Sequence, residues 1–124
     1  VFVDEEALIP LDTIVTDKGA SNYILISMKE RGKYRLDITL RATGGNEVAQ
    51  MPLSVFKDRD LQRTITLSGA DTEFRTESVD MDDCVAFFNF TLKLFFGQGG
   101  LEIKEIKIVR KESLEEEIMK EKNH

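Results

Sequence analysis

The chain has 124 residues, of which 41% are hydrophobic and 32% charged, and this composition is typical of one globular domain. Its formal net charge of −6 argues against nucleic acid as a partner, because a phosphate backbone attracts basic patches and the sequence shows none. No apolar run approaches the ~20 residues that a membrane-spanning helix needs. The single cysteine, Cys84, excludes an internal disulfide.

Two strand patterns follow an irregular start. The segment from Val1 to Leu11 is apolar and acidic, and the loop after it reaches Ser21, with a brief strand expected at 13–16. Strands are then predicted at Asn22–Met28 and Lys33–Ala42. Alternation in the second is complete, whereas a helix would distribute the same residues around its circumference. The positions expected to face inward are Ile24, Ile26, Met28, Tyr34, Leu36, Ile38, Leu40 and Ala42.

Three further strands are predicted in the middle of the chain, at Ala49–Phe56, Leu61–Leu67 and Phe74–Val79. Pro52 cannot donate to a ladder and therefore places the first of them at a sheet edge or at a bulge. Arg63 shares the parity of the apolar residues in its strand, so either the inner face is not wholly apolar or the strand begins late. The inward positions are expected to be Met51, Leu53, Val55, Leu61, Ile65 and Leu67.

A hairpin closes the pattern. Phe90–Phe96 alternates with period two, the glycine-rich turn 97–100 follows, and the chain returns through Leu101–Val109. The apolar spacing slips between Ile103 and Ile106, which predicts a bulge or local kink. About eight short strands with turns between them and no helix predict an all-β antiparallel sandwich or barrel.

The tail alone has a helical pattern. Ser113 followed by Glu116 fits a capping box, and Leu114, Ile118 and Met119 form a narrow apolar stripe. We therefore expect a β-sandwich over residues 1–110 and a charged helical linker or tail over 111–124. The stripe fits either a docking helix for a neighbouring domain or a solvated linker helix.

The sequence contains no recognisable catalytic constellation, and an enzyme is not expected. Cys84 is interpreted as a half-buried residue before a strand, because the only histidine, His124, is too remote in sequence to activate it. Asp80, Asp82 and Asp83 have the oxygen ligands that hard cations prefer, but such a run is usually a solvated turn.

Several aromatic residues lie off the core pattern. Phe56 and Phe95 fall on the outward parity of their strands, and Phe74 stands alone in a polar stretch. Such side chains can serve as platforms on which sugar rings stack. Alternatively, they can be covered by a loop, by the second sheet or by a neighbouring domain.

The order of elements resembles the galactose-binding-like jelly rolls, in particular carbohydrate-binding modules of families 6 and 35. The resemblance covers roughly Asn22 to Val109. It implies a jelly-roll β-sandwich that sits beside the catalytic domain of a bacterial glycoside hydrolase, where it either holds polysaccharide or only packs against the enzyme. The matching segments are Gly32–Ile38, Leu53–Phe56, Thr64–Gly69, Leu92–Phe96 and Leu101–Ile108.

The resemblance also implies a site. Modules of this kind commonly bind sugar in loops at one end of the sandwich, lined by aromatics and amides, and the matching positions here are Phe74, Gln98 and Asn46. They often share a structural calcium between a Glu-rich opening, here 4–7, and an Asp before the last strand. Lys104 stands at that last position and cannot ligate a cation, so no cofactor is expected.

The resulting expectation is a non-catalytic carbohydrate-binding-like accessory module of a larger glycoside hydrolase, with carbohydrate and the catalytic domain of the same polypeptide as partners. Two alternatives stay open: a purely structural interdomain module without a ligand, and an extracellular adhesion or sensor domain. The start at Val1, without methionine or signal sequence, is expected of a segment from a longer protein or of a mature fragment. The module is secreted or at the cell surface if the parent enzyme is exported, and cytoplasmic otherwise.

Overall fold

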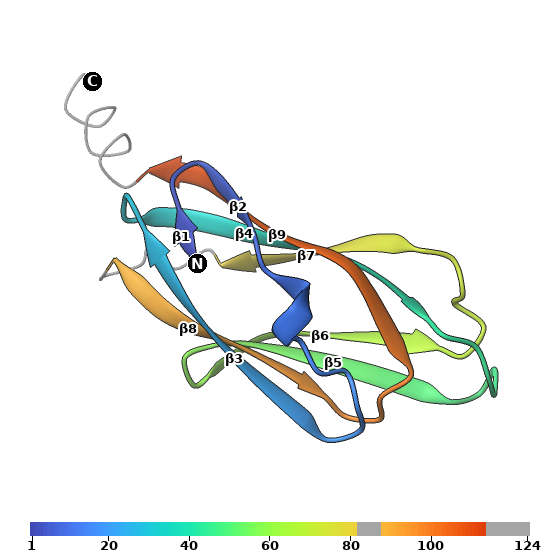
Figure 1. Cartoon of the computed structure of the whole chain (residues 1–124). Helices are drawn as coiled ribbons and strands as arrows, with labels where there is room; N and C mark the ends of the chain where they lie inside the picture. Colours follow the sequence, from blue (N-terminus) through green and yellow to red (C-terminus); the bar gives the residue numbers. More distant parts are fainter. Residues whose placement is uncertain (82–87, 114–124) are drawn as a thin grey trace.

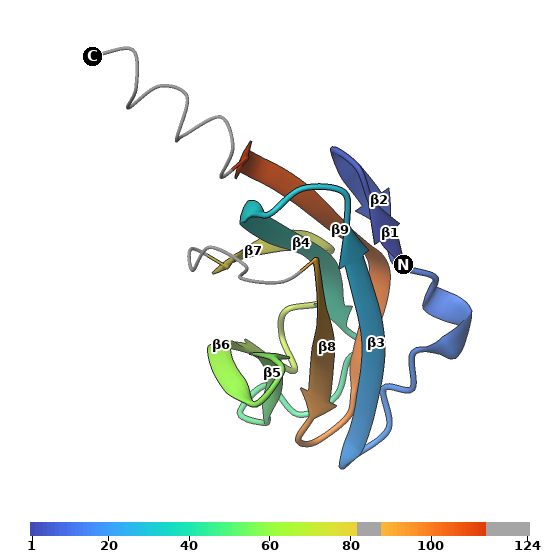
Figure 2. The ribbon, with the colours of Figure 1, turned by 90° about the vertical axis from the view of Figure 1, so that its left-hand side faces the viewer.

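The computed structural model describes residues 1–81 and 88–113, which form two β-sheets packed face to face (Figure 1 and Figure 2). The expected all-β sandwich is confirmed. The strand order is β1-β3-β8-β5-β6 in the five-stranded sheet and β2-β9-β4-β7 in the four-stranded sheet. Neighbouring strands are antiparallel, except that β1 and β3 are parallel. The strands are β1 (Phe2–Val3), β2 (Glu6–Leu8), β3 (Ala20–Met28), β4 (Gly32–Ala42), β5 (Gln50–Lys57), β6 (Asp60–Ser68), β7 (Arg75–Met81), β8 (Asn89–Phe96) and β9 (Leu101–Ser113).

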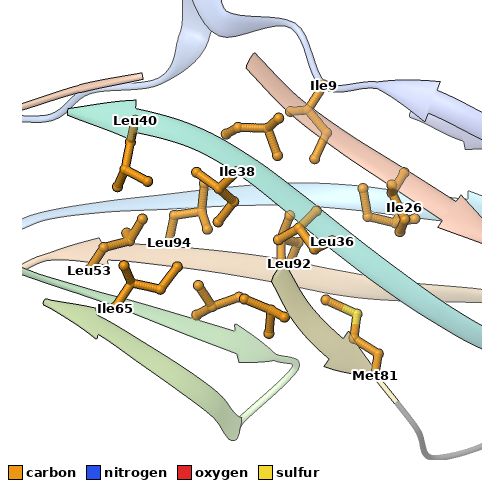
Figure 3. Packing of buried hydrophobic residues seen from close by; sticks show 14 of the residues in the cluster. Ile9, Ile26, Leu36, Ile38, Leu40, Leu53, Ile65, Met81, Leu92 and Leu94 are labelled. Carbon is orange, nitrogen blue, oxygen red and sulfur yellow. The ribbon is translucent and has the colours of Figure 1, made fainter. Parts of the chain in front are cut away.

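The core lies between the inner faces of the two sheets (Figure 3). The complete alternation predicted for β4 is confirmed, since every second residue from Tyr34 to Ala42 is buried. Facing residues such as Leu53 on β5 and Leu92 and Leu94 on β8 are fully buried as well. Each large aliphatic side chain removed from water in this way contributes about 1.5–3 kcal/mol to folding. A stable core therefore holds the loops in place.

The predicted irregularity in the last strand is a β-bulge at Lys104. Thr39 pairs with Glu105 and Leu40 with Ile103, so Lys104 has no partner on β4. The extra residue returns Ile106 to the buried face, which explains the slip in apolar spacing.

The predicted final hairpin is wrong, because β8 lies in the five-stranded sheet and β9 in the four-stranded sheet, so the glycine turn carries the chain from one sheet to the other. The turn depends on its glycines. Gly99 and Gly100 have φ values of 72° and 78°, which disfavour other residues. A Cβ at Gly99 would also lie 2.9 Å from the Lys18 nitrogen, and one at Gly100 would lie 2.8 Å from the Met51 sulfur. The turn is thus packed closely against both neighbouring segments.

The edge region of the five-stranded sheet differs from the sequence prediction. Leu61 was expected to face inward but is exposed, because the β5–β6 register shifts between Val55 and Phe56 and turns Leu61 outward. Pro52 does not mark an edge or a bulge, since β5 lies between β6 and β8. Its missing N–H costs no ladder bond, because the β5–β8 pairing begins only at Leu53.

Other expectations near the ends of strands are also corrected. The prediction of a brief strand at 13–16 is wrong. Leu11–Thr13 forms the 3-10 helix η1, and no strand follows before β3. Asp80 belongs to β7 and not to a turn, whereas residues 82–87, including Cys84, lie outside the described residues.

β9 continues past residue 110 to Ser113. The helical tail is not supported, since its expected capping residue, Ser113, ends β9 and 114–124 lie outside the described residues. None of the described residues forms a helix long and apolar enough to span a membrane.

Candidate functional site

One end of the sandwich is built from four connections: residues 14–19, 43–49, 69–74 and 97–100, here called the loop end (lower right in Figure 1). The strand register places them together, because the strand ends that border them are paired, as in Ala42–Leu101 and Ala20–Phe96. Backbone hydrogen bonds join the connections to one another. Thr43 N donates to Gly100 O (3.0 Å) and Ala42 N donates to Asp71 O (2.7 Å). The loop end is therefore one continuous surface.

Residues 14–19 are fixed by a buried asparagine that sequence reasoning did not single out. The Asn22 side chain accepts a hydrogen bond from Val15 N (2.8 Å) and donates one to Val15 O (2.8 Å). It also donates to Leu94 O at 3.4 Å. An amide that satisfies both backbone groups of one loop residue holds that loop against β3.

The structure brings the three expected site residues to the loop end but not into one hollow. Asn46 is exposed, and its Oδ1 accepts a hydrogen bond from Val48 N (3.0 Å), so it shapes its own loop. Gln98 is exposed at the tip of the glycine turn. Phe74 is half-buried and precedes β7, next to the outer face of the four-stranded sheet.

Two cations flank the Phe74 ring. Arg41 Cζ lies 4.5 Å and Lys104 Nζ 5.4 Å from the ring centre, both within the range of cation–π attraction. Lys104 is the bulge residue of β9, so the irregularity in that strand supplies one of the cations. These contacts hold the ring and compete with a sugar for its face.

A hollow at the loop end contains Gln98. It has a volume of about 490 Å³, within the range of small-molecule sites. Gln50 lies beside Gln98 there, and each amide offers two donors and an acceptor, which suits sugar hydroxyls. Sequence reasoning missed Gln50, which the sequence shows only as a polar residue at the start of a strand. This hollow, here called the glutamine hollow, is lined by Ala49, Gln50, Met51, Gln98, Gly99 and Gly100.

A second hollow of about 330 Å³ lies where η1 and the segment after it pack against the start of β9. Four aliphatic residues, two threonines and one glutamate line it. No sequence pattern indicates this hollow, because it forms between segments far apart in the chain. This hollow, here called the threonine hollow, is lined by Leu11, Ile14, Thr16, Thr43, Leu101, Glu102 and Ile103.

The acidic opening and Lys104 lie far apart. Asp4 pairs with Lys29 (3.7 Å) and Glu6 with Lys107 (3.8 Å). Glu6 is opposite Val109, about five strand residues or roughly 17 Å from Lys104. Residues 1–81 and 88–113 contain no group of three metal-ligating side chains.

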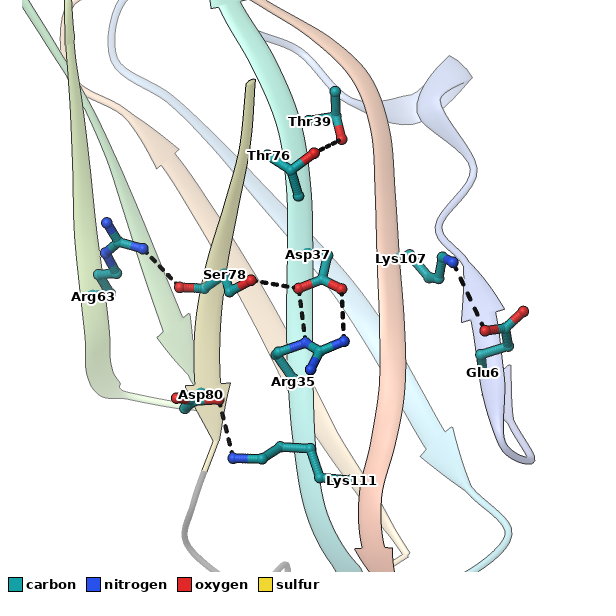
Figure 4. Close-up of polar contacts among 10 residues, drawn as sticks. All are labelled: Glu6, Arg35, Asp37, Thr39, Arg63, Thr76, Ser78, Asp80, Lys107 and Lys111. Carbon is teal, nitrogen blue, oxygen red and sulfur yellow. Dashed lines mark hydrogen bonds and ion pairs between the residues drawn. The ribbon is translucent and has the colours of Figure 1, made fainter. Parts of the chain in front are cut away.

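The outer face of the four-stranded sheet carries charged and hydroxyl side chains that bond to one another (Figure 4). Asp37 accepts hydrogen bonds from Arg35 Nε (2.9 Å) and Ser78 Oγ (2.7 Å), and Lys111 donates to Asp80 (3.1 Å). Such a face is well hydrated, and its groups already have partners. The hollows of the loop end are therefore the better candidates for ligand binding.

No protein-family model and no curated protein sequence matches the chain. Solved structures do share its fold. A family 35 carbohydrate-binding module from an environmental isolate is 17% identical, with a TM-score of 0.58 over 77% of this chain and 69% of that one. A family 6 module from Cellvibrio mixtus lichenase 5A, solved in complex with cellotriose, is 14% identical, with a TM-score of 0.52 over 77% of this chain and 74% of that one.

A larger enzyme contains the same fold. A β-glucosidase from Paenibacillus barengoltzii is 15% identical, with a TM-score of 0.61 over 87% of this chain but only 11% of the enzyme, so the chain spans about a tenth of that protein. Likeness at these identities shows the fold alone. The fold is that of the family 6 and family 35 modules, as the resemblance in the sequence implied.

Proposed function

We propose that this chain is a non-catalytic carbohydrate-binding module that holds an oligo- or polysaccharide at its loop end. The observation that carries the proposal is the glutamine hollow at that end, on a fold shared with solved carbohydrate-binding modules. Its two amides can each donate to and accept from sugar hydroxyls. The backbone at Gly99 and Gly100 has no side chain to keep a ring at a distance.

The expected affinity is low. The glutamine hollow has no aromatic lining, and cations flank Phe74, so stacking contributes little. A few hydrogen bonds that replace bonds to water contribute about 1 kcal/mol each, which fits dissociation constants near the millimolar range. Asn46 and Phe74 do not line this hollow, so only a ligand that extends beyond it could reach them.

The context we propose is an accessory position beside the catalytic domain of a glycoside hydrolase. The Paenibacillus enzyme supports it, since the same fold forms a tenth of that larger protein. The module would then concentrate substrate near the active site of its parent.

The test is an amide NMR titration with neutral plant and microbial oligosaccharides. Shifts are expected at residues 49–51 and 97–100. Gln98→Ala should weaken binding about five- to thirtyfold, because it removes one or two hydrogen bonds. The control is Gln62→Ala, since Gln62 bonds to Asp60 O at the start of β6. Equal weakening by both variants, or no shifts at millimolar sugar, would argue against the site.

A purely structural module is the second candidate, and the outer face of the five-stranded sheet favours it. Tyr23, Leu25 and Leu61 are 67%, 59% and 55% exposed there. Lys93 lies between Tyr23 and Phe56, at 5.7 and 4.9 Å from their ring centres, and has no carboxylate partner in the described part of the chain. The partner that fits is an apolar face of the catalytic domain that carries one carboxylate.

Tyrosine iodination separates the two candidates in the parent protein. Tyr23 should react in the isolated chain, whereas the fully buried Tyr34 should not and serves as the control. If the face is an interface, Tyr23 becomes protected in the parent protein. Full reactivity of Tyr23 in both the isolated chain and the parent protein would exclude an interface between this face and the catalytic domain.

A further inference from the structure

We propose that the threonine hollow receives the acetamido group of a 2-acetamido sugar, an inference that rests on the proposed carbohydrate-binding function. The hollow has about 330 Å³, at the lower end of the range for small-molecule sites, so it suits one substituted ring and not a length of polymer. It lies at the loop end, where Thr43 also bonds to Gly100 of the glutamine hollow. A ligand in one hollow is therefore close to the other.

The lining of the hollow suits a methyl group. Leu11, Ile14 and Ile103 pack against the core and are only partly buried, so each keeps some apolar surface accessible. A methyl group placed on this surface leaves water, which is favourable by roughly 25 cal/mol for each Å² buried. A sugar that carries only hydroxyls would leave the aliphatic lining uncovered.

Glu102 supplies an acceptor for an N–H group from the outer face of β9, the face opposite to that of its buried neighbour Leu101. Arg41 binds the carboxylate through one oxygen only, because its Nε (3.1 Å) and Nη2 (2.9 Å) both donate to Oε2. Oε1 accepts no hydrogen bond from any residue that the structure describes. The arginine thus fixes the carboxylate and leaves one charged oxygen open. A carboxylate only accepts, so its complement is a donor such as an amide N–H, and it repels acidic sugars.

Thr16 supplies a donor for the carbonyl oxygen. Thr16 lines the hollow, and its hydroxyl makes no hydrogen bond within the described part of the chain. Thr43 donates to Gly100 O (3.3 Å), so its hydroxyl can only accept from a ligand. An aliphatic lining, a fixed acceptor and an open donor match the methyl, N–H and C=O of an acetamido group.

The test compares two trisaccharides, N,N′,N″-triacetylchitotriose and cellotriose, which share the β-1,4-linked backbone and differ at C2. We expect the acetylated trimer to bind about tenfold more tightly, by NMR titration or calorimetry. Glu102→Gln should remove about tenfold of its affinity and leave cellotriose unaffected. Glu105→Gln is the matched control, because it removes the same charge from the same strand outside this hollow.

Thr16→Val tests the hollow independently of the Arg41–Glu102 pair and should weaken only the acetylated trimer. Equal affinity for both trimers, with shifts confined to 49–51 and 97–100, would overturn this inference and leave the proposed function intact. The glucosamine trimer carries ammonium groups in place of acetamido groups. If it binds as tightly as the acetylated trimer, charge attraction to Glu102 explains the binding, and the inference is overturned. No binding of any sugar would overturn both proposals.

Discussion

Phe74 shows how a side chain outside the core is held in place. Its ring is half-buried and lies next to Arg41 and Lys104, and Arg41 is itself fixed by Glu102. Each partly exposed cation–π contact is worth about 0.5–1 kcal/mol, much less than full burial of a phenylalanine. The ring therefore links the bulge of β9 to the start of β7, and this link contributes only modestly to the free energy of unfolding.

Phe74→Ala should lower the free energy of unfolding by about 1–2 kcal/mol, the sum of two such contacts and some lost burial. Urea denaturation measures this. The control is Phe96→Ala, since Phe96 is fully buried and its loss should cost about 3–5 kcal/mol. Equal losses in the two variants would mean that Phe74 is a core residue, and it could then not contribute to a sugar site.

At the scale of elements, Arg63 joins the two sheets along their open edges. β6 and β7 are the edge strands on the same side of the sandwich. Arg63 on β6 donates to Ser78 O (2.7 Å) and to Glu77 (2.8 Å), both on β7. An unpaired edge invites pairing with other chains, and a charged side chain bound to it opposes this.

Arg63→Ala should cost about 1 kcal/mol of stability, since the pair is partly exposed. The amide protons of β7 should exchange faster, because the strand loses its link to β6. Hydrogen exchange with NMR detection measures both effects. Arg59→Ala, in the exposed turn of the same hairpin, is the control and should change neither. Unchanged exchange in the Arg63 variant would contradict the proposed link.

The sequence shows that Arg63 falls on the same side of its strand as the apolar residues. It does not show that Arg63 contacts β7. Alternation predicted β4 and the bulge of β9, because burial on one face leaves a period of two that an extra residue interrupts. The register shift that exposes Leu61 left no such trace, since the apolar spacing of β6 looks regular. Local patterns report burial, whereas register also depends on the neighbouring strand.

At the scale of the whole molecule, the strand order joins distant parts of the chain. β3 pairs with β8 and β4 with β9, so most strand pairs join distant segments, and the β5–β6 hairpin is the one pair of consecutive strands among the described residues. Loop closure must precede such contacts, which slows folding. Refolding is expected to take milliseconds to seconds, and stopped-flow fluorescence of the tyrosines would measure it. Refolding within microseconds would contradict this topology.

The same topology explains why the candidate site could be predicted only in part. The resemblance led to Gln98, Phe74 and Asn46 and to one end of the sandwich, and the structure places all three there. It did not lead to Gln50, Thr16 or Glu102, because these meet their neighbours only after distant segments pack. A hollow between such segments has no continuous signature in the sequence.

The position of β9 has a consequence for biosynthesis. Although it is the last described strand, β9 lies between β2 and β4, so the four-stranded sheet stays divided until residues 101–113 have been made. At roughly 5–20 residues per second, the earlier strands wait on the order of ten seconds with their apolar faces uncovered. During this time the uncovered apolar faces and unpaired strand edges favour aggregation of the nascent chain. A premature stop before Leu101 would yield a chain that no later step could rescue.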